Sequence, residues 1–114
     1  MHKLAQLDQR YVWHPFTQMR DWAKREQIVL ARGKGAVLQD VHGGKYLDAN
    51  ASIWTNLHGH NHPKINAAIK RQLGKVAHTS ALGFANEPAA RLAERLVKAA
   101  KRPLRKVFFS DNGS

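Results

Sequence analysis

The stretch IVLARGKGAVLQDVHGGKYLD, residues 28–48, decides the fold expected of this chain. Three short runs rich in β-forming residues alternate there with glycine-rich turns, and the runs are 28–30, 36–40 and 45–48. Runs at this spacing predict an antiparallel meander with tight turns near 32–35 and 42–44. A three-stranded sheet buries a face only when another element covers it, so we expect neighbouring segments to pack on this one.

The residues before the meander, 1–27, predict an arm. Aromatic and charged residues mix there without a clean period, although a short helix fits before Tyr11. Pro15 disfavours helical backbone at His14. Because large aromatic side chains seldom stay in water, we expect the arm to lie against an apolar surface.

The meander and its following loop extend to residue 62, and residues 63–105 predict two helices. Asn61 or His62 is the expected cap of the first helix, and Asn86 is the expected cap of the second. Three prolines mark the helix ends, namely Pro63 and Pro88 in the first turns and Pro103 at the stop.

The last nine residues, KVFFSDNGS at 106–114, predict a strand followed by a turn that opens a helix. A continuous apolar run is typical of a strand buried on both faces of a parallel sheet, and the chain has no second run of this kind. We therefore expect a truncated larger domain. Gly113 permits close approach of an anion and Ser114 can donate its hydroxyl, although turns of this composition are also common without any ligand.

Charge and composition limit the functional classes. Nineteen Lys and Arg against eight Asp and Glu give a net charge of +11, so nucleic-acid binding is one hypothesis and a solvated basic face is the other. The chain has no cysteine, which excludes disulfides and thiolate metal sites. We expect no membrane span and no secretory signal, with the cytoplasm as the default location.

Three further features have both a chemical and a structural interpretation. The first is a set of alternating histidines, His58, His60 and His62. Such a run can bind zinc or copper on a strand, but Gly59 and Pro63 break extended geometry, so we expect imidazoles bonded to backbone and no metal. Asp40 and Asp48 lack a partner spaced for acid–base work and fit hairpin ends. Trp54 suits either a pocket or a core.

Several segments together resemble one family. They are HPFTQM at 14–19 after Trp13, DVHGGKYLD at 40–48, SIW at 52–54, HGHNHP at 58–63, GFANEPA at 83–89, RLAERL at 91–96 and VFFSDNGS at 107–114. Their order and register resemble the class III, fold-type I aminotransferases that act on S-adenosylmethionine and 8-amino-7-oxononanoate in biotin synthesis. The hexapeptide at 14–19 is the part of the resemblance that points to these particular substrates, whereas the other segments are shared by many class III enzymes.

The resemblance implies an α/β fold, of which this chain is an N-terminal fragment: the arm, the meander, two helices and the first strand of the large domain at 106–114. It implies that Gly113 and Ser114 bind the phosphate of pyridoxal 5'-phosphate. Trp54 is expected to line the substrate pocket, and Phe16 to lie near the active site. Ala49-Asn50 and Ile53 depart from some relatives, which concerns the shape of the pocket and not the cofactor.

The resemblance also implies small-molecule substrates, no nucleic-acid or membrane partner, and a homodimer for the full-length enzyme. The catalytic lysine, the aspartate at the cofactor ring nitrogen and the carboxylate-binding arginine are expected beyond Ser114, so no residue of 1–114 is assigned a catalytic role and no turnover is expected from these residues alone. Two alternatives stay open. One is another class III aminotransferase acting on an ω-amino acid, ornithine or a polyamine, and the other is a small basic nucleic-acid-binding module.

Overall fold

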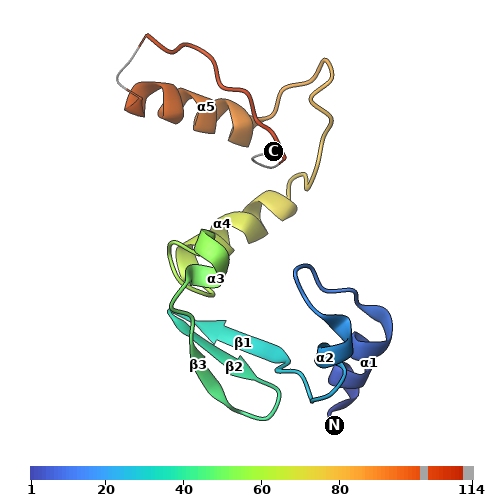
Figure 1. Cartoon of the computed structure of the whole chain (residues 1–114). Coiled ribbons are helices and arrows are strands. Elements are labelled where there is room, and N and C mark those ends of the chain that lie inside the picture. Colours follow the sequence, from blue (N-terminus) through green and yellow to red (C-terminus); the bar gives the residue numbers. More distant parts are fainter. Residues whose placement is uncertain (101–102, 112–114) are drawn as a thin grey trace. The chain divides into compact units, whose positions relative to one another are not determined.

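The computed structural model describes residues 1–100 and 103–111 and separates into two compact units, Met1–Lys70 and Arg71–Ser114. The first unit holds the arm, a three-stranded sheet and the loop that follows it (Figure 1). The second unit holds the last helix and the chain that leads into and out of it. Each unit is described by itself below.

The sheet of the first unit is an antiparallel meander, as predicted. Its strands are β1 (Leu30–Lys34), β2 (Val37–Asp40) and β3 (Lys45–Leu47), and they lie in the order β1-β2-β3. Lys34 pairs with Val37 and Gln39 pairs with Lys45, which fixes the two hairpins. This arrangement confirms the prediction from residues 28–48.

The position of the first hairpin turn differs from the prediction. The turn was expected near residues 32–35, but 32–34 belong to β1, and the loop consists of Gly35 and Ala36. Gly35 has a φ of +57°, a backbone conformation that favours glycine and suits a two-residue hairpin loop. Gly35 thus lies in the loop as predicted, whereas Ala36, which was expected to begin the second strand, is the other loop residue.

The second hairpin turn is organised by one carboxylate. The Oδ1 atom of Asp40 accepts hydrogen bonds from the amides of His42 (2.9 Å) and Gly44 (2.7 Å), and its Oδ2 atom accepts one from the Tyr46 hydroxyl (2.7 Å). These bonds, led by that of Tyr46, hold the pKa of Asp40 below its usual value. Asp40 therefore has the hairpin-end role expected of it.

The arm contains two helices, α1 (Lys3–Tyr11) and α2 (Met19–Trp22), and the first confirms the short helix expected before Tyr11. Side-chain amides hold α1 against the chain that follows α2. The amide nitrogen of Gln9 donates to the Gln27 side-chain oxygen (2.8 Å) and to the Arg25 carbonyl (2.9 Å). Gln27 is itself 7% exposed, so this contact lies in the interior of the arm.

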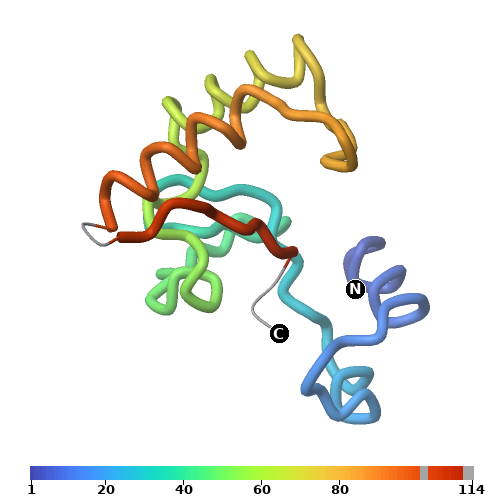
Figure 2. The backbone as a smooth tube through the Cα atoms, turned by 90° about the horizontal axis from the view of Figure 1, so that it is seen from above, coloured from blue at the N-terminus to red at the C-terminus, as the bar shows by residue number. Residues whose placement is uncertain are grey.

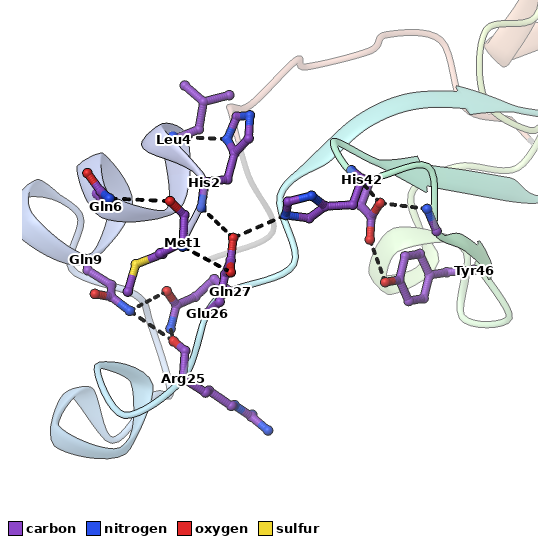
Figure 3. Close-up of polar contacts among 12 residues, drawn as sticks. Met1, His2, Leu4, Gln6, Gln9, Arg25, Glu26, Gln27, His42 and Tyr46 are labelled. Carbon is purple, nitrogen blue, oxygen red and sulfur yellow. Dashed lines mark hydrogen bonds and ion pairs between the residues drawn. The ribbon is translucent and has the colours of Figure 1, made fainter.

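Glu26 joins the start of the arm to the second hairpin turn (Figure 3). Its Oε1 atom accepts the amide of His2 (2.6 Å) and faces the Nε2 atom of His42 (3.2 Å), and its Oε2 atom lies 3.8 Å from the amino group of Met1. The rings of His2 and His42 meet edge to face. The arm is therefore joined to the second hairpin turn by these polar contacts and by the His2–His42 ring contact.

Helices α4 (Pro63–Leu73) and α5 (Glu87–Ala99) confirm the two helices predicted over 63–105. The side chain of Asn86 accepts the amide of Ala89 (3.0 Å), as expected of an N-cap. Helix α5 ends before Pro103, and residues 103–111 run back in the direction opposite to α5 (Figure 2).

The strand predicted at 106–110 is not formed. Residues 103–111 contain neither helix nor strand, and Phe108 is 92% exposed. A strand requires a hydrogen-bonded neighbour, and the sheet of the described residues consists of β1, β2 and β3 without this segment. The prediction of a strand at 106–110 is therefore wrong for the described residues. Gly113 and Ser114, the expected phosphate-binding residues, lie outside the described residues.

Little apolar surface is covered in the described part of the chain. Ala5 is the buried hydrophobic residue there, and the apolar stripe of α5 stays half exposed, with Leu92 at 48% and Leu96 at 45%. Among the described residues, none of the helices has the length and apolar run needed to cross a bilayer. Trp13 and Phe16 of the arm are also exposed, so the arm is not covered by an apolar surface of the described residues as expected.

The loop after β3 returns to the sheet at a pair of glycines, which gives a direct test of the fold. Gly35 and His60 exchange backbone hydrogen bonds of 3.1 and 2.8 Å, and a Cβ added to Gly59 would lie 3.0 Å from the Gly35 backbone. At Gly35 itself a Cβ would meet nothing within 4 Å. Both glycines have positive φ.

We expect Gly35→Ala to lower the free energy of unfolding by about 1–2 kcal/mol through backbone strain alone. Gly59→Ala should cost a further ~1–3 kcal/mol, because its methyl group would lie 3.0 Å from the Gly35 backbone, which would have to shift to make room. Urea unfolding followed by circular dichroism measures both. Equal losses in the two variants would contradict the close approach of the loop to the sheet.

Candidate functional site

Trp54, the expected pocket residue, ends a left-handed turn. The four residues of α3 (Ala51–Trp54) all have positive φ, from +51° at Ala51 to +65° at Trp54. Left-handed backbone costs an L-residue about 1–2 kcal/mol, and a β-branched residue such as Ile53 rarely adopts it. A run of four requires the surroundings to hold it in place, and strained backbone of this kind concentrates at functional sites.

The carboxylate of Asp48 holds this turn. Its Oδ1 atom accepts the backbone amide of Ser52 (2.8 Å), and its Oδ2 atom accepts the Ser52 hydroxyl (2.8 Å) and the Nε2–H of His60 (2.7 Å). The two bonds from Ser52, amide first, lower the pKa of Asp48 most, and the bond from His60 adds to them. The Asp48 side chain is only 7% exposed. These three donors therefore stabilise its negative charge where little water reaches it.

His60 connects the turn to the sheet. Its Nδ1 atom lies 2.7 Å from the side-chain nitrogen of Asn56, and its Nε2 atom lies against Asp48. An amide N–H donating to Nδ1 and a carboxylate accepting from Nε2 fit the neutral imidazole with its proton on Nε2. The ring also lies over Gly33, where an added Cβ would come within 2.8 Å of the His60 Cβ.

These contacts correct two sequence interpretations. Asp48 was expected to lack a chemical partner, but the fold brings His60 to it across twelve positions of the sequence. The histidines were expected to bond to backbone, yet the His60 ring bonds to side chains. Both errors have one cause, since the contact depends on the loop returning to Gly35. Within the described residues no group of three His, Cys, Asp or Glu side chains is placed to hold a metal.

Phe16, the second expected site residue, is also presented by a constrained backbone. Its φ is +50° and its side chain is fully exposed. The carboxylate of Asp8 bonds to His14 Nε2 (2.9 and 3.0 Å) and accepts the Trp22 indole N–H (2.9 Å). The rings of His14 and Trp22 also pack together, with centroids 4.4 Å apart. The segment at 14–19 is thus fixed on both sides of Phe16.

Of the four predicted site residues, the structure describes Trp54 and Phe16, whereas Gly113 and Ser114 lie outside the described residues. Trp54 (82% exposed) and Phe16 both lie in the first unit with their rings in solvent, and no ring contact joins them in the described part of the chain. Asp48, Ser52 and His60 were missed as site residues. The spacing of an Asp four residues before a Ser, directly after a strand, was the available signal, because such an Asp can bond the following backbone.

Comparison with known proteins defines the class. The family model for class-III aminotransferases matches residues 19–114, and the chain belongs to this family. Two curated relatives are named adenosylmethionine-8-amino-7-oxononanoate aminotransferase. The Staphylococcus aureus protein is 52% identical over 98% of this chain, and the Aquifex aeolicus protein is 50% identical over 97% of it. The chain spans about a quarter of the length of each of these relatives.

Solved structures agree with this assignment and establish the fold as that of the fold-type I transaminases. The adenosylmethionine-8-amino-7-oxononanoate aminotransferase of Methanocaldococcus jannaschii is similar over 84% of this chain and 22% of its own, with a TM-score of 0.81 and 44% identity. The omega transaminase of Pseudomonas jessenii in complex with PMP is similar over 99% of this chain and 25% of its own, with a TM-score of 0.91 and 28% identity.

The contacts of Asp8 predict an acid-dependent stability of the arm. The indole of Trp22, followed by His14, lowers the pKa of Asp8 in the folded chain. A lowered pKa means that the stabilisation is complete above the unfolded value of about 3.9 and is lost as the pH falls through the lower folded value. We expect Asp8→Asn to reduce the loss of unfolding free energy between pH 6 and pH 2, measured by urea titration.

Asp21→Asn is the matched control for this prediction, because the Asp21 carboxylate is exposed and pairs with Lys24 alone in the described contacts. Asp21→Asn should leave the loss of unfolding free energy between pH 6 and pH 2 nearly as in the parent chain. If Asp8→Asn and Asp21→Asn lost the same unfolding free energy between pH 6 and pH 2, the role given to Asp8 would be contradicted.

Proposed function

We propose that this chain is the amino-terminal quarter of an adenosylmethionine-8-amino-7-oxononanoate aminotransferase. The enzyme would move an amino group from S-adenosylmethionine to 8-amino-7-oxononanoate and give 7,8-diaminononanoate, a step of biotin synthesis. The observation that carries the proposal is the 52% identity to the Staphylococcus aureus enzyme over 98% of this chain. The hexapeptide at 14–19, which precedes most of the matched family region, supports the narrower substrate assignment.

A second candidate is a class III transaminase with another amino donor. It is favoured by the similarity in fold to the omega transaminase of Pseudomonas jessenii, with a TM-score of 0.91. The fold is common to both candidates, however, and the sequence identity differs, at 28% for that enzyme and 44% for the Methanocaldococcus jannaschii one. Because substrate choice depends on pocket side chains more than on backbone shape, the identity favours the first candidate.

Gly113 and Ser114 are the residues proposed to hold the phosphate of pyridoxal 5'-phosphate. Backbone N–H groups next to glycine and a serine hydroxyl are donors that fit a phosphate, and such donors suit the start of a helix. The cofactor, when bound, supplies the electron-withdrawing ring and aldehyde that accept and release the amino group. The chain's own contribution there is to anchor and orient the phosphate end.

Trp54 and Phe16 are proposed to contact the substrates. An exposed indole and an exposed phenyl ring, each on a backbone fixed by an Asp–His pair, offer flat apolar surfaces at low entropic cost. Such surfaces suit the adenine of S-adenosylmethionine and the aliphatic chain of the keto acid. They would orient these groups and exclude water from the reacting end.

The setting of the full-length enzyme is part of the same proposal. We place it in the cytoplasm as a homodimer, without nucleic-acid or membrane partners. The chain would divide into an arm (1–27), the meander and its loop (28–62), a helical part (63–105) and the start of the large domain (106–114). The exposed stripe of α5 and the exposed Phe108 are surfaces that the remainder of such an enzyme would cover.

The function can be tested in a chimera in which this chain replaces the matching quarter of the Staphylococcus aureus enzyme. We expect the chimera to use S-adenosylmethionine with 8-amino-7-oxononanoate, measured by product formation under saturating cofactor. Transfer from ω-amino acids or polyamines instead of S-adenosylmethionine would favour the second candidate. A chimera that binds the cofactor but transfers no amino group from any of these donors would contradict both.

In this chimera, Trp54→Ala should raise the KM for one of the two substrates about tenfold with a smaller change in kcat, because an aromatic contact worth about 1.4 kcal/mol is lost. Trp13→Ala is the matched control, since Trp13 is similarly exposed (88%) and has no assigned contact to substrate. Equal KM values for Trp54→Ala and the parent chimera would contradict the role of Trp54.

A further inference from the structure

The contacts around the left-handed turn assign a role to residues that the family resemblance did not mark. Four backbone bonds close the turn, among them Trp54 N to Asn50 O (2.9 Å) and Asn56 N to Ala51 O (2.9 Å). Backbone bonds of this kind do not favour a left-handed turn over a right-handed one, because the preference is set by contacts of the Cβ atoms. The side-chain contacts must therefore supply the preference.

Those side-chain contacts converge on one carboxylate. Asp48 follows β3 directly, so its position is set by the pairing of Leu47 with Val37. From there it bonds both the amide and the hydroxyl of Ser52, the second residue of the turn. A single fixed acceptor that bonds two donors of one residue defines the orientation of that residue as well as its position.

The far side of the turn is held through His60. Asn56 follows the turn by two residues and contacts Nδ1 of His60, whose Nε2 atom returns to Asp48. His60 is 18% exposed in its side chain and is itself tied to Gly35 by two backbone bonds. The turn is thus bracketed at Ser52 and Asn56, with Trp54 midway between the two attachment points.

We propose that Asp48, acting through Ser52 and His60, is a positioning residue that holds the left-handed turn and so sets the orientation in which Trp54 meets substrate. The inference rests on the proposed substrate contact of Trp54. Asp48 itself touches neither substrate nor cofactor. Its effect passes through the backbone of 51–54, and it determines how tightly a substrate binds and not the rate of the chemical step.

The turn itself can be observed in the 114-residue chain by NMR. A positive φ brings the amide and α protons of a residue unusually close, so Ser52 and Ile53 should give strong intraresidue NOEs between these protons. Asp48→Asn should weaken them, because the Oδ2 acceptor of Ser52 and His60 is replaced by an amide donor. Ser52→Ala, which removes the hydroxyl alone, is a milder second variant and should weaken them less.

Asp40→Asn is the matched control. Asp40 is the last residue of β2 and, like Asp48, accepts three hydrogen bonds. Its donors belong to the hairpin between β2 and β3 and not to the left-handed turn. It should leave the NOEs of Ser52 and Ile53 unchanged. Loss of these NOEs in Asp40→Asn, or their retention at full strength in both Asp48→Asn and Ser52→Ala, would overturn the proposal.

A rescue experiment separates positioning from general destabilisation. Ile53→Gly removes the steric cost of left-handed backbone at Ile53, whose φ is +61° and ψ is +63°. In the chimera, Asp48→Asn should raise the KM of the substrate affected by Trp54→Ala about tenfold, with kcat within about twofold of the parent. Adding Ile53→Gly to Asp48→Asn should recover at least part of that KM.

The outcomes distinguish this inference from the proposed function. If Trp54→Ala leaves KM unchanged, the substrate role of Trp54 fails, whatever Asp48 does to the turn. If Trp54→Ala raises KM but Asp48→Asn does not, the substrate role stands and the positioning role is overturned. A fall in kcat for Asp48→Asn that Ile53→Gly does not reverse would also overturn it.

Discussion

The carboxylate of Asp48 is the contact on which the presentation of Trp54 depends. It lies at the end of β3, accepts three hydrogen bonds, and links a strained turn to a histidine that is itself fixed on the sheet. Each partner is set by an independent part of the fold. The strand places the carboxylate, the glycines let the loop approach the sheet, and the loop returns His60 to the carboxylate. Removing any of these leaves four left-handed residues without their restraint.

The same arrangement occurs in the arm with different residues. Asp8 binds His14 and the indole of Trp22, and the chain between them presents Phe16 at positive φ. In both places a carboxylate and an imidazole fix the backbone while the aromatic ring remains exposed. A small unit with little buried apolar surface cannot hold such rings by packing. The hydrogen bonds of Asp48 and Asp8 fix the backbone that carries the rings instead.

The sequence was sufficient for features that depend on local chemistry. The meander followed from β-rich runs and glycine turns, and α5 followed from Asn86 and Pro88. It was insufficient where distant residues meet, as between Asp48 and His60. It also gave the first hairpin turn only as the range 32–35, because that range holds two glycines and the pattern does not say which of them forms the loop. The strand expected at 106–110 requires neighbours that the described residues do not provide. Gly113 and Ser114, expected from the composition of the turn and from the resemblance, lie outside the described residues.

The contact between His60 and Asp48 is tested most directly by locating the proton on the His60 ring, read from nitrogen-15 NMR of the imidazole in the 114-residue chain at neutral pH. We expect a slowly exchanging proton on Nε2, hydrogen-bonded to Asp48, and an unprotonated Nδ1 that accepts from Asn56. A proton found on Nδ1, or an imidazole that exchanges as freely as a solvent-exposed histidine, would contradict it.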